Sequence, residues 1–267
     1  MTFLLLLFLS SLHWFLGFFE EPSLASLGAG GVLAVGFMYG LKHATEADHV
    51  VAVSTIVSQE KNLKWAAFVG AFWGAGHTAS LFVVGLIVIS LRINIPENIS
   101  SWMEFGIAIM IIALGTNALM RIWRSANSDH QHLPGTNHTH DHDHQHSHSQ
   151  ASNVSTRGFK LKPIIIGTLH GLAGSAALTL LVLTDIKSPI LGIAYLLIFG
   201  LGSIIGMLLM SGAIGLPFAM SSNRLTKFNY ALQVFTPIFS IIFGCWYGYQ
   251  TEIPNSILSM FMSVVVR

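Results

Sequence analysis

Residues 65–91 read WAAFVGAFWGAGHTASLFVVGLIVISL, and this stretch carries no Asp, Glu, Lys or Arg. A helix needs about 20 apolar residues to cross the hydrocarbon core of a bilayer, so the stretch is long enough to span a membrane. Across its 267 residues the chain is 52% hydrophobic and 9% charged, with a mean hydropathy of +0.64. Soluble domains carry about 25% charged residues. The composition therefore predicts a polytopic membrane protein.

Further mostly apolar segments predict an all-α fold with about seven transmembrane helices. The first segment lacks a basic leader and a small-residue cleavage site, so it is interpreted as a retained helix. Six or eight helices are the alternatives, because residues 253–267 are apolar as well. The expected helices cover residues 3–19, 27–57, 64–92, 100–124, 163–185, 189–213 and 228–250.

A polar loop at residues 125–160 separates a first transmembrane half, residues 1–124 with helices 1–4, from a second half, residues 161–267 with helices 5–7. The loop holds eight of the thirteen histidines, interleaved with Asp, Gln, Ser and Thr. Such a composition does not form a packed core, so the loop is expected to be disordered. A metal buffer is the favoured interpretation, and a polar spacer is the alternative. The buffering histidines are His138, His140, His142, His144, His146 and His148.

Short sequence echoes in matching order indicate an internal duplication. GLKHA at 40–44 resembles GTLHG at 167–171, and WGAGH at 73–77 resembles FGLGS at 199–203. Each copy would hold three helices, so the two copies would have opposite orientations in the membrane. A 3+3 inverted repeat of this kind is typical of secondary transporters, which bind their substrate near the bilayer midplane.

The distribution of Lys and Arg predicts the orientation of the chain. Nine of the thirteen basic residues lie in loops on one side, which the positive-inside rule assigns to the cytoplasm. The His-rich loop is then cytoplasmic, and the membrane is expected to be the bacterial plasma (inner) membrane. A net charge of +1 without a basic stripe excludes a nucleic-acid partner. The nine residues are Lys61, Lys64, Arg121, Arg124, Arg157, Lys160, Lys162, Arg224 and Lys227.

Residues 40–50, GLKHATEADHV, place ionisable side chains inside an apolar segment. Each costs at least about 2.5 kcal/mol in a membrane, which favours a functional role. Imidazoles with carboxylates suit nickel, cobalt and zinc. On a straight helix, His43, Glu46 and His49 share a stripe about 120° wide, and Asp48 lies on nearly the opposite face. Either Asp48 supports the ligands from outside the site, or the helix unwinds here.

Two more histidines, His77 in GAGHTAS and His170 in GTLHGLAGSAAL, lie among small residues that let helices approach closely. Each is either a metal ligand or an interhelical hydrogen-bonding group. The polar cluster also has a structural alternative, a hydrogen-bond network in which Lys42 pairs with Glu46.

These residues resemble a known family. HATEADH at 43–49 fits the H-x4-D-H signature of the nickel–cobalt permeases, the NicO group, and GAGHTAS resembles their second signature. HGLAGSAAL and the His-rich loop look like the urease-accessory type of bacterial member. The resemblance implies that the signature residues bind the transported ion. They are His43, Asp48, His49 and His77, with Glu46 as a further ligand. His170, judged from its own sequence context, is the candidate for a second-repeat site.

The expected function is a permease, not an enzyme, that takes up Ni2+ or Co2+. These ions are the transported substrate, and no prosthetic group is expected. Expected partners are the lipid bilayer and either nickel chaperones or urease and hydrogenase accessory proteins. Efflux of the same ions is the alternative. An intramembrane metal-dependent hydrolase is disfavoured because HATEADH lacks HExxH spacing, and a metal sensor because no signalling domain is present.

The charge asymmetry predicts the topology. Single cysteines introduced beside Lys61, Arg157 and Arg224 in a Cys245→Ala background should label from the cytoplasmic side, and a cysteine at the C-terminus from outside. Labelling of the C-terminus from the cytoplasm alone would show that the number of membrane helices is even.

Overall fold

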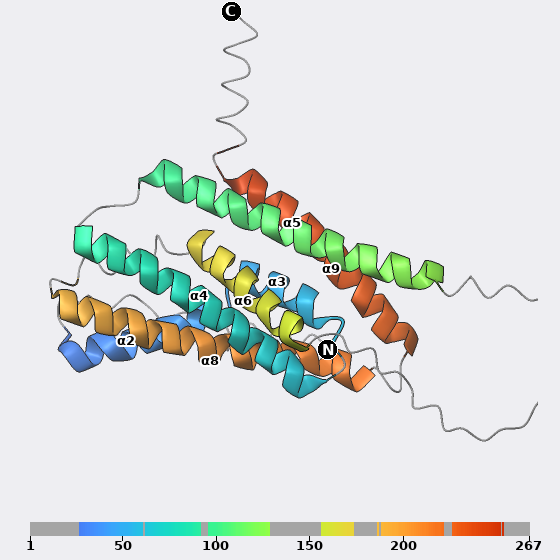
Figure 1. The fold of residues 1–267 in the computed structure, drawn as a ribbon, viewed down its shortest axis with the longest axis horizontal. Coiled ribbons are helices and arrows are strands. Elements are labelled where there is room, and N and C mark those ends of the chain that lie inside the picture. The colour runs from blue at the N-terminus through green and yellow to red at the C-terminus, as the bar shows by residue number, and fades with distance from the viewer. Residues whose placement is uncertain are drawn as a thin grey trace, which may run out of the picture.

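The structure, a computed structural model, describes residues 27–60, 62–91, 96–128, 156–173, 186, 188–221, 226–251 and 253. Within these ranges the chain is helical and contains no strand. The expected helix 3–19 and the His-rich loop histidines lie outside the described residues. The helices are α2 (Ala29–His43), α3 (Ala47–Val57), α4 (Leu63–Leu91), α5 (Glu97–Ser128), α6 (Thr156–Ala173), α8 (Pro189–Ser221) and α9 (Thr226–Gln250) (Figure 1).

Four of these helices contain segments long and apolar enough to cross a membrane, at Leu63–Leu91, Asn98–Ser125, Pro189–Met220 and Asn229–Gln250. Their outward-facing side chains include many exposed Leu, Ile, Phe and Trp residues, as expected for a surface in contact with lipid. The predicted all-α, polytopic membrane fold is confirmed. Where the expected ends fall on described residues, the observed helix ends differ from them by up to eight residues; the expected end of helix 163–185 lies outside the described residues. The largest internal difference is a break within the expected helix 27–57.

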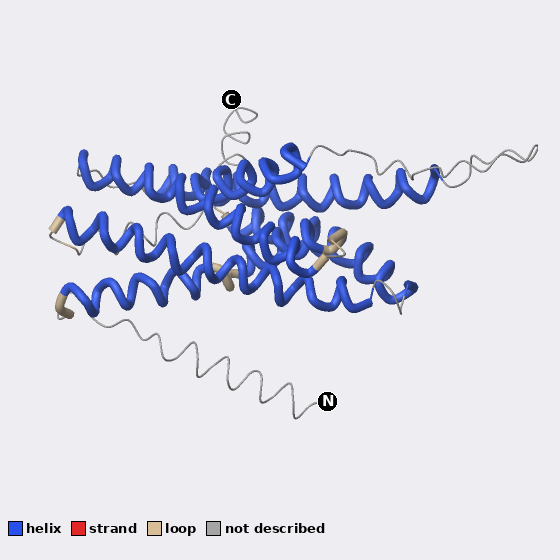
Figure 2. Tube along the Cα trace, turned by 60° about the horizontal axis from the view of Figure 1, so that its bottom comes forward, coloured by secondary structure: helices blue, strands red, loops and turns tan. Residues whose placement is uncertain are grey.

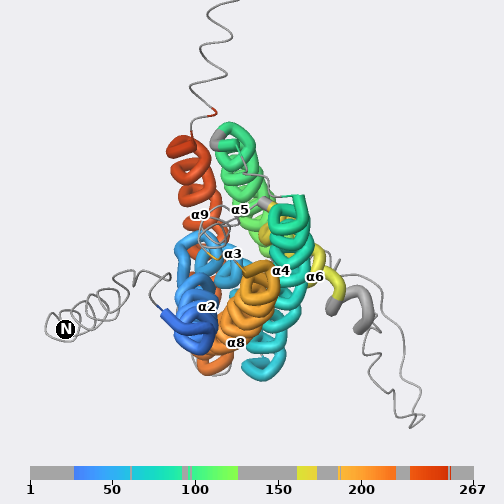
Figure 3. The backbone as a smooth tube through the Cα atoms, turned by 90° about the vertical axis from the view of Figure 1, so that its left-hand side faces the viewer, coloured from blue at the N-terminus to red at the C-terminus, as the bar shows by residue number. Residues whose placement is uncertain are grey.

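The helices form two layers with α3 between them. In one layer α2 packs on α8, α8 on α4 and α4 on α6, whereas α5 packs mainly on α9 (Figures 1 and 2). Viewed along the bundle, α3 lies centrally, and it contacts α5 and α9 on one side and α8 on the other (Figure 3). This short helix therefore lies where the two layers meet.

Glycines allow the first layer to pack backbone against backbone. A Cβ atom at Gly40 on α2 would collide with the carbonyl oxygen of Phe199 on α8, and one at Gly167 on α6 would collide with that of Trp73 on α4. The first contact joins GLKHA to FGLGS and the second joins GTLHG to WGAGH, so the two contacts correspond to each other under the suggested duplication. The duplication stays a prediction, and the matched contacts support it.

Candidate metal centre

The helix breaks between α2 and α3, so the polar residues of the stretch 40–50 are divided between the end of one short helix and the start of the next. Thr45 donates its hydroxyl hydrogen to the carbonyl of Lys42, 2.6 Å away, and Glu46 has an extended backbone with φ −63° and ψ 147°. Side chains that bond locally to the backbone in this way compete with helix continuation. Irregular backbone at membrane depth is tolerated only inside protein or beside a cavity. The unwound alternative for this segment is therefore the one that the structure adopts.

The break turns Asp48 towards histidines instead of the opposite face. Asp48 lies in the first turn of α3, where the positive end of the helix dipole favours a carboxylate. Its Oδ1 accepts a hydrogen bond from His49 Nδ1 at 2.9 Å, and its Oδ2 accepts one from His170 Nε2 at 2.9 Å. All three side chains are buried. His170 comes from the last turn of α6, 122 residues further along the chain.

A second contact pairs two histidines from different helices. His43 Nε2 at the end of α2 lies 2.9 Å from His77 Nε2 in the middle of α4, and both rings are buried. Glu46 Oε2 lies 3.0 Å from His43 Nδ1, but its side chain is 39% exposed. Glu46 is thus placed to orient His43 from the rim of the cluster.

The hydrogen bonds assign protons to the rings. A carboxylate only accepts hydrogen bonds, so His49 carries its hydrogen on Nδ1 and His170 on Nε2. In neutral rings His49 Nε2 and His170 Nδ1 are then unprotonated, and neither has a hydrogen-bond partner among the described residues. If Glu46 holds a hydrogen on His43 Nδ1, then His77 donates from Nε2 and its Nδ1 is likewise unprotonated and unpartnered within the described chain. Buried polar atoms are almost always satisfied, and three such nitrogens together are a donor set that fits a metal cation.

Two overlapping groups of side chains have ligand atoms close enough to hold one ion. In each group, one ligand atom per residue lies within 4.8 Å of the others. The first group is His43, His49 and His77; the second is Asp48, His49 and His170. His49 belongs to both, and its ring centroid lies 4.4 Å from that of His43 and 4.2 Å from that of His170.

Close helix packing makes this clustering possible. A Cβ atom at Gly171 on α6 would collide with Ser80 and the backbone of His77 on α4. Only glycine therefore lets the two helices come near enough for their histidine rings to lie 5.7 Å apart.

Two neighbouring polar groups were missed from the sequence. Trp73 is fully buried, with its ring 5.5 Å from His170, and its Nε1 has no partner in the described part of the chain. The buried Ser203 hydroxyl on α8 also has none there. Both positions occur in the echoed pentapeptides WGAGH and FGLGS, so the repeat contained the only sequence signal for them.

Comparisons with known proteins agree with this chemistry. The profile of the NicO family, described as high-affinity nickel-transport protein, matches residues 29–238. The urease accessory protein UreH of Bacillus sp. (strain TB-90) is 34% identical over 232 residues, which cover 86% of this chain and 96% of that protein.

More distant similarity reaches plants. The chloroplast proteins FOR GROWTH AND FERTILITY 2 and 1 of Arabidopsis thaliana are 25% and 24% identical over 174 residues. The match covers 64% of this chain but only 44% and 46% of those proteins. No solved structure matches the chain.

The hydrogen bonds of Asp48 generate a test. Asp48→Asn keeps the side-chain shape, but an amide has only one oxygen to accept from two imidazoles. One ring should lose its orientation, and Ni2+ affinity should fall about 10- to 100-fold, as is typical when a group orienting metal ligands is lost. Isothermal titration calorimetry of the purified protein measures this Ni2+ affinity. Glu46→Gln at the exposed rim is the matched control and should have a smaller effect; equal losses for both variants would contradict the assignment.

Proposed function

The chain belongs to the NicO family of high-affinity nickel-transport proteins, and we propose that it takes up Ni2+, with Co2+ as a second substrate, through the buried histidine–aspartate cluster. The family is a transport family, which agrees with a permease instead of an enzyme. The proposed ligands are His43, Asp48, His49, His77 and His170.

One observation carries the choice of site. The break in the helix gathers four imidazoles and one carboxylate from α2, α3, α4 and α6 at a buried position between helices. Imidazole nitrogen and carboxylate oxygen are the ligands that suit Ni2+ and Co2+. A structural hydrogen-bond network explains Asp48 well, but it leaves unexplained the nitrogens of His49 and His170 that have no partner among the described residues. Helix ends that meet at an ion are also the arrangement found in other secondary transporters.

The overlap of the two groups suggests how the ion moves. An ion held by His43, His49 and His77 can exchange two ligands for Asp48 and His170 while it keeps His49. Stepwise exchange avoids a state in which the dehydrated ion has no ligand. Asp48 then has two successive roles. It first orients His49 and His170, and it afterwards contributes its negative charge to the second group of ligands.

The similarity to a protein named as a urease accessory protein favours uptake over efflux. Nickel chaperones or urease and hydrogenase accessory proteins are the proposed partners on the cytoplasmic side. The positive-inside distribution of Lys and Arg supports placing the His-rich loop on that side of the plasma membrane.

Transport assays test both site and direction. Replacing His43, Asp48 or His49 singly by Ala should reduce 63Ni2+ accumulation in right-side-out vesicles by about ten-fold or more, because each loss removes a ligand or its support. Ser240→Ala is the control, since its hydroxyl bonds to the carbonyl of Ile111 in the separate α5–α9 contact. Full activity in all three variants would refute the site, whereas accumulation only in inverted vesicles would indicate efflux.

The loop histidines are proposed to buffer metal, not to form part of the permeation path. Loose imidazole sites raise the local ion concentration, whereas selectivity requires a fixed ligand shell. Deleting residues 129–149 should preserve the preference for Ni2+, change the rate or apparent affinity only a few-fold and remove the extra nickel bound by the purified protein. Abolished transport in correctly inserted protein would instead make the loop an obligatory donor or gate.

A further inference from the structure

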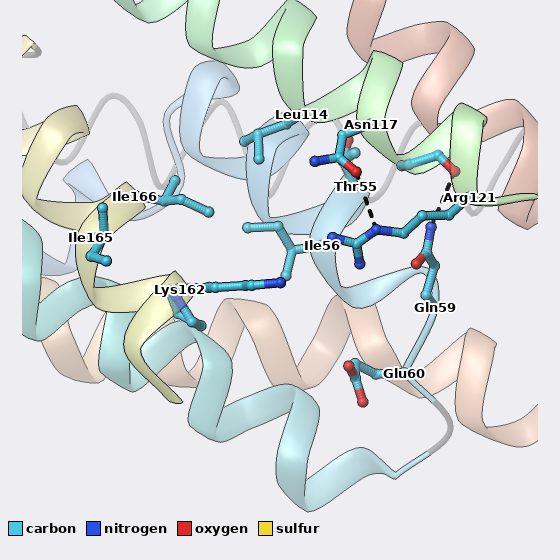
Figure 4. A pocket seen from close by; sticks show the side chains of 12 residues that line it. Thr55, Ile56, Gln59, Glu60, Leu114, Asn117, Arg121, Lys162, Ile165 and Ile166 are labelled. Atoms are coloured by element: carbon cyan, nitrogen blue, oxygen red, sulfur yellow. Dashed lines mark hydrogen bonds between the residues drawn. The ribbon is translucent and has the colours of Figure 1, made fainter. Parts of the chain in front are cut away.

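A cavity of about 410 Å³ lies between α3, α5 and α6 (Figure 4). It is close to the histidine cluster along the chain, because Ile166 in its wall precedes His170 by one helical turn. It is chemically different from that cluster: among the residues that the structure describes, no histidine lines it, and its charged groups are Arg121, Lys162 and Glu60.

The cavity carries more positive than negative charge. Arg121 on α5 and Lys162 on α6 extend into it from different helices (Figure 4). Asn117 Oδ1 accepts a hydrogen bond from Arg121 Nε at 3.1 Å, which orients the guanidinium and leaves its terminal N–H groups for other acceptors. Burial raises the pKa of the Glu60 carboxyl, so the one acidic side chain in the wall is a weaker counter-charge than usual. Such a cavity favours an anion and disfavours Ni2+.

Apart from Thr55 and Gln59, the rest of the lining is apolar, and it continues onto the lipid-facing surface. Ile56, Leu114 and Ile166 lie in the wall, and Ile165 is both in the wall and 55% exposed. A row of exposed apolar side chains that includes Ile165 runs along one face of α6. That row comprises Leu161, Ile165, Leu169 and Leu172. An occupant with an anionic head and an apolar tail would match both parts.

The depth of the Arg121 and Lys162 side chains in the membrane also fits contact with a lipid headgroup. Arg121 lies close to the end of the apolar span Asn98–Ser125, and Lys162 is the second residue of the apolar stretch Leu161–Leu172. Charged side chains at the ends of such spans lie near the level of the bilayer phosphates. Basic pockets between transmembrane helices are a recognised way to bind anionic headgroups.

We propose that this cavity binds an anionic membrane phospholipid, whose phosphate contacts Arg121 and Lys162 and whose acyl chain follows the exposed row on α6. Because α5 packs mainly on α9 and has only smaller contacts with α3 and α6, the lipid would connect the α5–α9 layer to the helices that carry the histidines. The site is independent of the nickel-transport proposal.

Purified, delipidated full-length protein reconstituted with phosphatidylcholine alone or with added phosphatidylglycerol tests the proposal. Native mass spectrometry counts retained lipid, and a thermal melt measures stabilisation. Arg121→Gln with Lys162→Gln should weaken phosphatidylglycerol retention on the order of 30-fold, since each basic residue near an anionic lipid contributes about five-fold. Lys64→Gln with Arg124→Gln removes the same charge from exposed positions outside the cavity and should retain the lipid.

Several outcomes would overturn the proposal. Equal losses in both double variants would show general charge attraction, and stabilisation by inorganic phosphate alone would show a site for the free anion. Unchanged lipid retention with faster Ni2+ flux in the cavity variant would show that the cavity is the route of the ion. If the double variant fails to fold, the single variant Lys162→Gln is compared with Lys64→Gln, using protein that elutes as the wild type does. Equal lipid retention by these two single variants refutes the site.

Discussion

The carboxylate of Asp48 accepts hydrogen bonds from imidazoles on two different helices, and the buried cluster depends on this one group. A carboxylate without partners inside a membrane is costly, whereas two N–H donors satisfy it. The same bonds decide which nitrogen of His49 and of His170 stays unprotonated. Because the helix must break for Asp48 to reach His170, the irregular backbone and the proposed ion ligands form one arrangement.

Glycine sets how closely the helices around this group can pack. A Cβ atom at Gly76 would collide with the carbonyl of Ile164, and one at Gly202 would collide with that of Phe37. These contacts match each other across the predicted repeat, as those of Gly40 and Gly167 do. Where α4 has His77, however, the matching position of α8 has a serine. If the halves arose by duplication, they share the packing glycines but differ in most of the imidazoles.

Composition was enough to predict the polytopic membrane fold, and helical periodicity placed His43 and His49 on one stripe. His77 was added to them by the family resemblance, because its sequence context left it either a ligand or an interhelical hydrogen-bonding group. Unwinding of the helix near Asp48 was one of two alternatives that the sequence left open, since neither Pro nor Gly marks residues 44–46. The contact of Asp48 with His170 could not be predicted, because the two residues are 122 positions apart in the chain. A straight helix would have placed Asp48 away from the histidines. The cavity between α3, α5 and α6 likewise depends on side chains that only tertiary packing brings together.

The proposed function rests on the helical histidines, not the loop histidines, binding the ion. X-ray absorption at the nickel K-edge tests this most directly in protein lacking residues 129–149 and loaded with one equivalent of Ni2+. The expected spectrum contains the outer-shell scattering of at least two imidazole rings, which disappears in a variant that also carries His49→Ala. A nickel shell of oxygen atoms alone, or imidazole scattering unchanged by His49→Ala, would contradict the assignment of the site.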